Sequence, residues 1–198
     1  MAEEKAPYHH GDLRKGLIAE GHNLLREVGP EEFSLRELGR RLQVSPRAPY
    51  RHFASKEELL AALAVEGFDL MTAYFDATVC DDPAERLRLL GAVYVRFAHE
   101  NPALFRLMFS PIIASDHVLN KPNVAFDRLV SACAPLQPPD TLVRDRIRFA
   151  TAIWSGLHGM ALIGLDGVGG LYDSGVFVTP ADLIDWLIVG QTSSRMTP

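Results

Sequence analysis

Apolar residues recur along most of the chain at intervals of three and four positions, the spacing that gives an α-helix one buried face. In residues 12–28 this spacing places on roughly one side Leu13, Leu17, Ile18, Leu24, Leu25 and Val28. Gly29 and Pro30 follow directly, and such a pair is typical of the end of a helix. No segment of useful length alternates apolar and polar residues as a half-buried strand does. The pattern therefore predicts an all-α protein.

Helix-capping residues divide this pattern into about nine helices. Ser34 and Glu37 have the offset of a capping box, and so do Ser55 and Glu58. We expect Pro122 to interrupt the seventh helix, because proline has no backbone N–H to donate. The predicted helices cover residues 12–28, 34–42, 45–53, 55–78, 82–100, 101–109, 116–134, 140–165 and 179–189.

The chain has 198 residues, of which 47% are hydrophobic, enough for a core in one large domain or in a small domain joined to a larger one. The two cysteines, Cys80 and Cys133, have neither metal-binding nor redox spacing, which excludes a disulfide scaffold and fits a reducing cytoplasm. The first residues are polar and of mixed charge, unlike a signal peptide. We predict a cytoplasmic protein without a cofactor or a bound metal.

One uncharged run, residues 149–165, needs comparison with a membrane span. It is slightly shorter than the roughly 20 residues that cross a bilayer, and it contains His158 together with glycine and serine residues. We therefore predict a buried helix in the core or at a subunit interface, and no membrane partner.

The net charge of −5 is distributed unevenly. Residues 36–56 contain six basic side chains and one acidic side chain, whereas residues 59–198 carry a net charge of −5. DNA phosphates attract local positive charge, so a basic patch on an acidic protein can bind DNA. The same charges also fit a solvated basic surface, and the charge alone does not decide between the two.

Two short predicted helices, residues 34–42 and 45–53, flank a turn of about three residues that Val44 fills. The second begins with Ser45 and Pro46, a cap followed by proline at the first helical position. Small and basic residues at its N-terminal end would let it enter a DNA major groove about 12 Å wide and reach base edges. The segment therefore predicts a helix-turn-helix.

Arg47 and Arg51 lie one turn apart on this expected recognition helix, so either can make a bidentate contact to guanine. Tyr50, His52 and Lys56 suit phosphates, which fix the register without reading the sequence. Lys56 also begins the next helix, whose free N–H groups favour a phosphate. The candidate DNA-contacting residues are Ser34, Gln43, Ser45, Pro46, Arg47, Ala48, Tyr50, Arg51, His52 and Lys56.

The string VSPRAPYRHFASKEELL, residues 44–60, resembles the DNA-binding region of the tetracycline-repressor (TetR) family at Val44, Ser45, Tyr50, His52, Phe53, Lys56, Leu59 and Leu60. YHHGDLR, residues 8–14, is similar to the start of one branch of that family. WSGLHG, residues 154–159, resembles the Trp-His-Gly signature of one type of C-terminal ligand domain. The resemblance implies a three-helix DNA-binding domain at residues 1–55 and a helical bundle for ligand binding and dimerisation at residues 56–198.

The sequence departs from the family pattern at two positions. Leu42 and Gln43 stand where the family often has alanine and glycine. Glutamine adopts a left-handed conformation at a cost of about 1 kcal/mol, so we expect an altered turn in which Gln43 itself is a candidate to reach DNA. Pro49, at the fourth position of the expected recognition helix, removes a backbone donor, and we expect a tight first turn.

The resemblance further implies a ligand cavity among the helices from about residue 83 onward. The candidate ligand-binding residues are Tyr94, Phe97, Phe105, Met108, Trp154 and His158. Aromatic rings and flexible methionine suit a small hydrophobic effector, but they also fit ordinary core packing. His158 is either a polar anchor for the ligand or a core histidine.

The helix at 140–165 and the last helix are too apolar to be exposed on both sides. Paired across a two-fold axis they would form a four-helix interface, which predicts a homodimer. A symmetric dimer would bind double-stranded DNA at a palindromic operator, with half-sites about 34–36 Å apart. A ligand held against the connecting helix at 56–78 would then tilt the DNA-binding domain, provided that its affinity differs between the two states.

Enzymatic motifs are not evident, and we predict no catalytic residues. His99-Glu100 lacks the second histidine of a zinc-binding helix. The glycine-rich residues 164–170 follow a helix and fit neither a phosphate-binding loop nor a dinucleotide fingerprint. The prediction is thus a ligand-responsive repressor. Two alternatives stay open: a DNA-binding regulator without a small-molecule ligand, and an activator.

Overall fold

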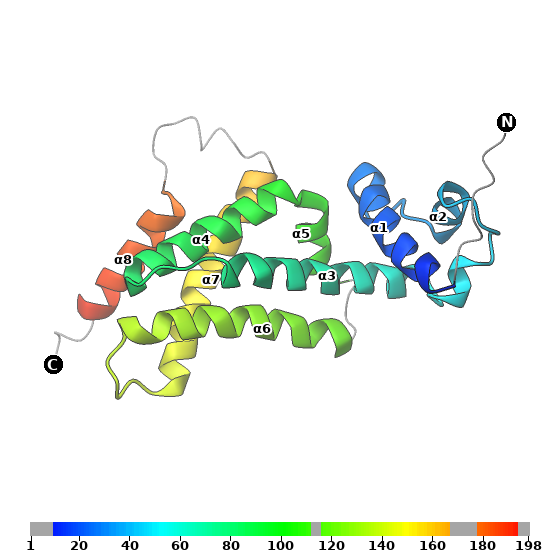
Figure 1. The fold of residues 1–198 in the computed structure, drawn as a ribbon. Coiled ribbons are helices and arrows are strands. Elements are labelled where there is room, and N and C mark those ends of the chain that lie inside the picture. The colour runs from blue at the N-terminus through cyan, green and yellow to red at the C-terminus, as the bar shows by residue number, and fades with distance from the viewer. Residues whose placement is uncertain (1–9, 112–115, 167–177, 194–198) are drawn as a thin grey trace. The chain divides into compact units, whose positions relative to one another are not determined.

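The computed structural model describes residues 10–111, 116–166 and 178–193, and within these ranges it contains helices and no strand (Figure 1). The α-helices are α1 (His10–Val28), α2 (Leu35–Arg41), α3 (Lys56–Asp76), α4 (Pro83–Glu100), α5 (Pro102–Met108), α6 (Asp116–Cys133), α7 (Val143–Leu165) and α8 (Pro180–Ser193). Two short 3-10 helices are η1 (Pro49–Arg51) and η3 (Ala134–Leu136). The predicted all-α fold is confirmed. Tyr8, His9 and the loop at 167–177 lie outside the described residues.

The chain divides into two compact units, each described here by itself. The N-terminal unit combines Met1–Gly67 with Ala103–Leu119, and the C-terminal unit combines Phe68–Pro102 with Asn120–Pro198. α3 contributes residues to both units. The domain boundary that we expect between residues 55 and 56 stays a prediction.

The core of the N-terminal unit joins α1, α2, η1 and the first half of α3. Its central side chains are at most 2% exposed, among them Leu17, Leu24, Leu38, Phe53 and Leu60. The spacing of Leu17 and Leu24 is the helical spacing that predicts α1, so the apolar face of that helix is the one that is buried. This packing fixes where the turn after α2 leaves the unit.

In the C-terminal unit, α4, α7 and α8 pack against one another (Figure 1). Two glycines let them approach closely. A Cβ atom at Gly91 would lie 2.7 Å from Cδ1 of Ile184, and one at Gly156 would lie 2.6 Å from Cδ2 of Leu183. An ion pair joins α4 to α8, with Arg88 Nε 2.7 Å from the carboxylate of Asp185.

Three of the predicted helix starts are capped as expected. Ser55 Oγ accepts a hydrogen bond from the backbone N–H of Glu58, and Asp82 caps α4 through the N–H of Glu85 at 2.7 Å. Thr179 and Asp182 form a reciprocal capping box at the start of α8, through Thr179 Oγ1 and the Asp182 carboxylate.

Other predicted features of the helix boundaries are wrong. Ser34 makes no side-chain cap, because its carbonyl accepts from Leu38 N–H and the Glu37 carboxylate binds arginines instead. α6 continues through Pro122. α7 begins at Val143, three residues later than expected. Among the described helices, none combines the length and apolar character needed to cross a membrane.

Candidate nucleic-acid interface

The recognition segment, which we define as Ser45–Phe53, lies against the N-terminal core by two residues and exposes most of the others. Pro49 and Phe53 are buried, and Phe53 is only 2% exposed. The exposed residues are Ser45, Pro46, Arg47, Tyr50 and Arg51, while Ala48 and His52 are half-buried. A surface of basic, hydroxyl and small side chains is thus open to a partner.

This segment is not the α-helix that the sequence predicts. The backbone N–H groups of Ala48, Arg51 and His52 each donate to the carbonyl three residues earlier, at 2.9–3.2 Å. Only Phe53 donates four residues back, to Pro49. Pro49 has no N–H for the carbonyl of Ser45, which accepts from Ala48 instead. The segment is therefore wound as a turn followed by η1, so that α-helices number eight within the described residues rather than about nine.

The turn between α2 and the recognition segment depends on two residues. Gln43 has a φ of 56°, the left-handed conformation expected where glycine is absent. Gly39 lets the segment pack closely on α2, since a Cβ there would lie 3.3 Å from Cγ of Pro49. The Val44 N–H donates to the Gly39 carbonyl at 2.9 Å and closes the turn. Gly39 was not singled out in the sequence, because a single helical glycine does not reveal which ring it faces.

Arg41 joins α1 to α2 through three carboxylates. Its guanidinium binds Glu20 at 3.0 Å, Glu27 at 2.5 Å and Glu37 at 3.0 Å. Arg40 also binds Glu37, and these two arginines lower the pKa of Glu37 to about 2. The charges of Arg40 and Arg41 are thus largely compensated within the unit, and they contribute little to DNA attraction.

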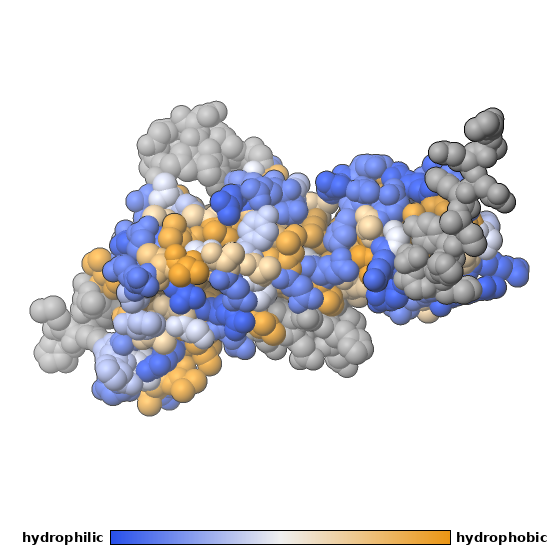
Figure 2. Space-filling model, viewed as in Figure 1, coloured by the Kyte–Doolittle hydropathy of each residue, from blue (hydrophilic) through white to orange (hydrophobic). Residues whose placement is uncertain are grey.

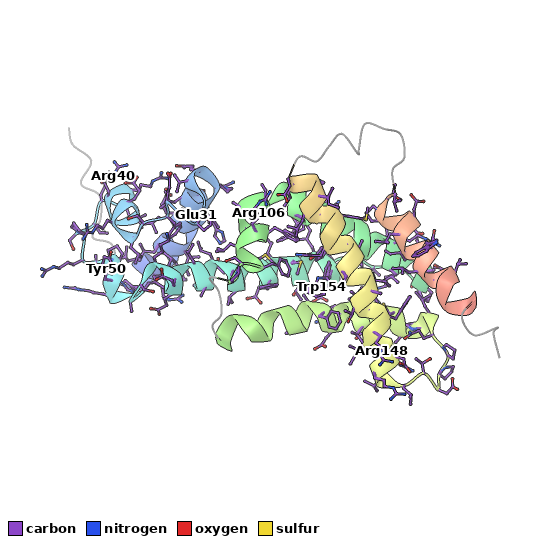
Figure 3. The ribbon with its side chains drawn as sticks, turned by 180° about the vertical axis from the view of Figure 1, so that it is seen from behind. Glu31, Arg40, Tyr50, Arg106, Arg148 and Trp154 are labelled. Atoms are coloured by element: carbon purple, nitrogen blue, oxygen red, sulfur yellow. The ribbon has the colours of Figure 1, made fainter. Side chains whose placement is uncertain are left out.

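The remaining positive charge lies where a partner can reach it. The exposed arginines Arg36, Arg47 and Arg51 have no ion-pair partner among the described residues. Arg36 was missed as an individual site in the sequence, where its position within the basic run was the only signal. Figure 3 shows Arg40 and Tyr50 at the surface of the same unit.

Other predicted DNA-contacting residues are held in place by the unit itself. Lys56 Nζ donates to the Glu31 carbonyl at 2.7 Å, which fixes the ammonium but leaves its charge intact. The guanidinium of Arg14 stacks over the Phe53 ring at 5.1 Å and secures the end of the recognition segment. Gln43 is exposed and Ser34 half-buried. The structure thus places all ten predicted residues along α2, the turn, the recognition segment and the start of α3.

A second polar cluster lies inside the C-terminal unit, between α4 and α7. The Tyr94 hydroxyl is 3.2 Å from Trp154 Nε1 and 2.8 Å from His158 Nδ1. An indole N–H can only donate, so Tyr94 accepts from Trp154 and donates its own hydrogen to His158. His158 is then neutral with its hydrogen on Nε2. Burial raises the pKa of Tyr94 and lowers that of His158, which favours the same neutral arrangement.

The other predicted ligand-binding residues are packed elsewhere. Phe97 is 0% exposed and contacts Tyr74 edge to face at 5.8 Å in the C-terminal unit. Phe105 and Met108 belong to the N-terminal unit, where Phe105 packs on Phe109 with ring centroids 5.0 Å apart. The structure thus brings Tyr94, Trp154 and His158 into direct contact, and the remaining three residues are core side chains by their burial.

An exposed helix-turn-helix beside a helical unit with a buried polar cluster defines the class of DNA-binding transcriptional regulators. Comparison with known families agrees. Residues 17–63 match the tetR family of bacterial regulatory proteins, and residues 87–190 match a tetracyclin repressor-like C-terminal domain. The chain belongs to the TetR family, and its Trp-His-Gly residues are consistent with this C-terminal type.

The chain is similar to several individual proteins. It is 30% identical over 105 residues to the nucleoid occlusion factor SlmA of Edwardsiella ictaluri, a match that spans 51% of this chain and 53% of SlmA. The chain therefore spans about half the length of the curated relatives it matches.

Two solved structures share the fold across nearly the whole chain. A protein of unknown function from Rhodococcus sp. RHA1 has a TM-score of 0.73 and 28% identity, covering 96% of both chains. A TetR variant from Acinetobacter baumannii, solved in complex with minocycline, has a TM-score of 0.63 and 21% identity, covering 91% of this chain and 97% of that one.

Proposed function

We propose that the protein is a ligand-responsive repressor that binds a palindromic operator as a homodimer. The observation that carries the proposal is the recognition segment, which presents Arg47, Tyr50 and Arg51 to solvent while Pro49 and Phe53 anchor it. Arginine in this position can reach guanine edges in a major groove. The uncompensated charge around it supplies the phosphate attraction that any such complex needs.

The outer faces of α7 and α8 support a dimer. Trp186 is 74% exposed and Val189 is 61% exposed on α8, and Ile163 is 43% exposed on α7. Figure 2 shows hydrophobic residues at the surface near α8. Gly159 and Gly190 face open space, so a second copy could approach these helices closely. Two copies of the pair would bury this apolar surface in a four-helix interface.

The cluster of Tyr94, Trp154 and His158 supports a small effector in the C-terminal unit. Its aromatic rings offer apolar contact, and the arrangement of hydrogen atoms makes His158 a donor at Nε2. We propose a small hydrophobic effector that carries a hydrogen-bond acceptor. The minocycline complex of the A. baumannii protein supports small-molecule binding in this fold. α3, which contributes to both units, is the element through which we expect the effector to act.

The experiment combines DNA binding with oligomeric state. Duplexes from the DNA upstream of the coding region are tested by gel retardation, and an inverted repeat should be retarded with two protomers for each site. Trp186→Arg should convert the dimer to monomers and weaken retardation, whereas the control Val79→Arg, at an 83% exposed position outside α7 and α8, should change neither. A protein that stays dimeric as Trp186→Arg would contradict the proposed interface.

A second candidate function is a DNA-binding regulator without a small effector. The complete burial of Phe97 favours it, because a filled core leaves less room for a ligand. Titration of hydrophobic compounds against the operator complex distinguishes the two. Release of DNA that is lost in His158→Ala supports the effector, whereas no release by any compound favours the second candidate. A reporter gene behind the operator shows whether binding represses or activates.

A further inference from the structure

We propose that Arg47 and Tyr50 act together as the pair that reads base edges, and that Arg51 contacts the DNA backbone. The proposal rests on the DNA-binding function and adds which side chains give specificity. It differs from the expectation drawn from the sequence, in which Arg47 and Arg51 share a helical face and Tyr50 contacts a phosphate.

The winding of the recognition segment changes which side chains are neighbours. An α-helix has 3.6 residues per turn, so Arg47 and Arg51 would be separated by only about 40° around its axis. A 3-10 helix has about 3.0 residues per turn, and residues three apart are then aligned. The hydrogen bonds of Ala48, Arg51 and His52 all span three residues. Arg47 therefore aligns with Tyr50, and Arg51 lies about 120° away.

Pro49 fixes how this segment is rotated on the unit. It is buried, and its ring lies over Gly39, where a Cβ atom would be 3.3 Å from Cγ. With Pro49 pointing inward, two rows of side chains point outward on either side of it. One row holds Arg47 and Tyr50, and the other holds Ala48 and Arg51.

The two outward rows differ in exposure and chemistry. Arg47 and Tyr50 are both exposed, with 46% of Tyr50 accessible to solvent, whereas Ala48 in the other row is half-buried. The first row thus presents a guanidinium and a phenol hydroxyl side by side. These groups can bind guanine bidentately and donate to or accept from the neighbouring base edge. Arg51, alone in a row that is partly covered, is left to the phosphates.

The test selects binding sequences from a randomised duplex library and then measures affinities at several salt concentrations. Tyr50→Phe keeps the ring and removes the hydroxyl. It should reduce discrimination at one base position about fivefold or more, with the salt dependence unchanged. Arg51→Gln should weaken binding to all sequences alike and reduce the slope of log affinity against log salt by about one.

A third variant tests the cause. Pro49→Leu restores the backbone donor and keeps an apolar side chain against Gly39, so the segment can wind as an α-helix. In this background Arg51 should gain influence on one base position, and Arg51→Gln should then change the selected sequence. Circular dichroism confirms that each variant is folded.

The outcomes separate the proposal from the function beneath it. A Tyr50→Phe protein that loses affinity evenly, or an Arg51→Gln protein that loses discrimination at one base, overturns the reading pair. A native protein that enriches no sequence from the library overturns the DNA-binding function itself.

Discussion

Gln43 provides a direct test of the turn that positions the recognition segment. Its φ of 56° places a residue with a Cβ atom in the left-handed region, where the Cβ crowds the following carbonyl. Glycine has no Cβ and adopts this conformation freely. Because Gln43 is exposed, its replacement disturbs no core contact. We therefore expect Gln43→Gly to stabilise the fold.

The magnitude follows from two opposing effects. Removing the left-handed strain gains about 1–2 kcal/mol. Glycine also gives the unfolded chain more freedom, which returns about 0.5–1 kcal/mol of that gain. The net stabilisation is about 0.5–1 kcal/mol, or a rise in Tm of about 1–4 °C for a chain of this length. Gln43→Ala is the matched control, since it removes the side chain but keeps the Cβ and hence the strain.

Urea denaturation at one fixed protein concentration measures all three proteins, because the apparent stability of an oligomer depends on concentration. We expect Gln43→Gly to have a higher midpoint than the native protein, and Gln43→Ala to stay within about 0.5 kcal/mol of it. If Gln43→Gly is no more stable than Gln43→Ala, the left-handed strain does not limit the turn and the reasoning is refuted.

Three further outcomes follow from the structure. Arg41→Gln should lower the Tm because it leaves three carboxylates facing one another, whereas Arg36→Gln, at an exposed site, should leave the Tm unchanged and weaken DNA binding. Asp82→Ala should cost about 1 kcal/mol in urea denaturation through its lost cap, and Ser34→Ala, which has no side-chain cap to lose, clearly less; equal losses would contradict this. Burial lowers the folded-state pKa of His158, so the unfolded chain binds the extra proton first and stability should fall as the pH drops through about 6.5; a His158→Gln protein with the same pH slope would exclude this histidine as its source.

Much of the fold could be predicted because its signals are local. The spacing of leucines in α1 and the caps at Asp82 and Thr179 act between residues three or four positions apart, where chain geometry alone decides what can meet. The left-handed turn at Gln43 and a disturbance at Pro49 were also predictable, since a side chain on Cβ and a missing N–H act on the backbone beside them.

The candidate site could be predicted only as a list of residues. Whether Glu37 caps α2 or binds Arg41 depends on where α1 brings Glu20 and Glu27, and no local rule supplies that. The bond between Tyr94 and His158 joins residues 64 positions apart.

The sequence by itself determined that the chain is helical, where most helices begin, and which segment carries the helix-turn-helix. The tertiary structure alone decided how the recognition segment is rotated, which arginines keep an uncompensated charge, and how Trp154 meets Tyr94. The physical reason is range. Backbone sterics and capping hydrogen bonds act within one turn of helix, whereas charge pairing and side-chain packing act through space between elements that only the fold brings together.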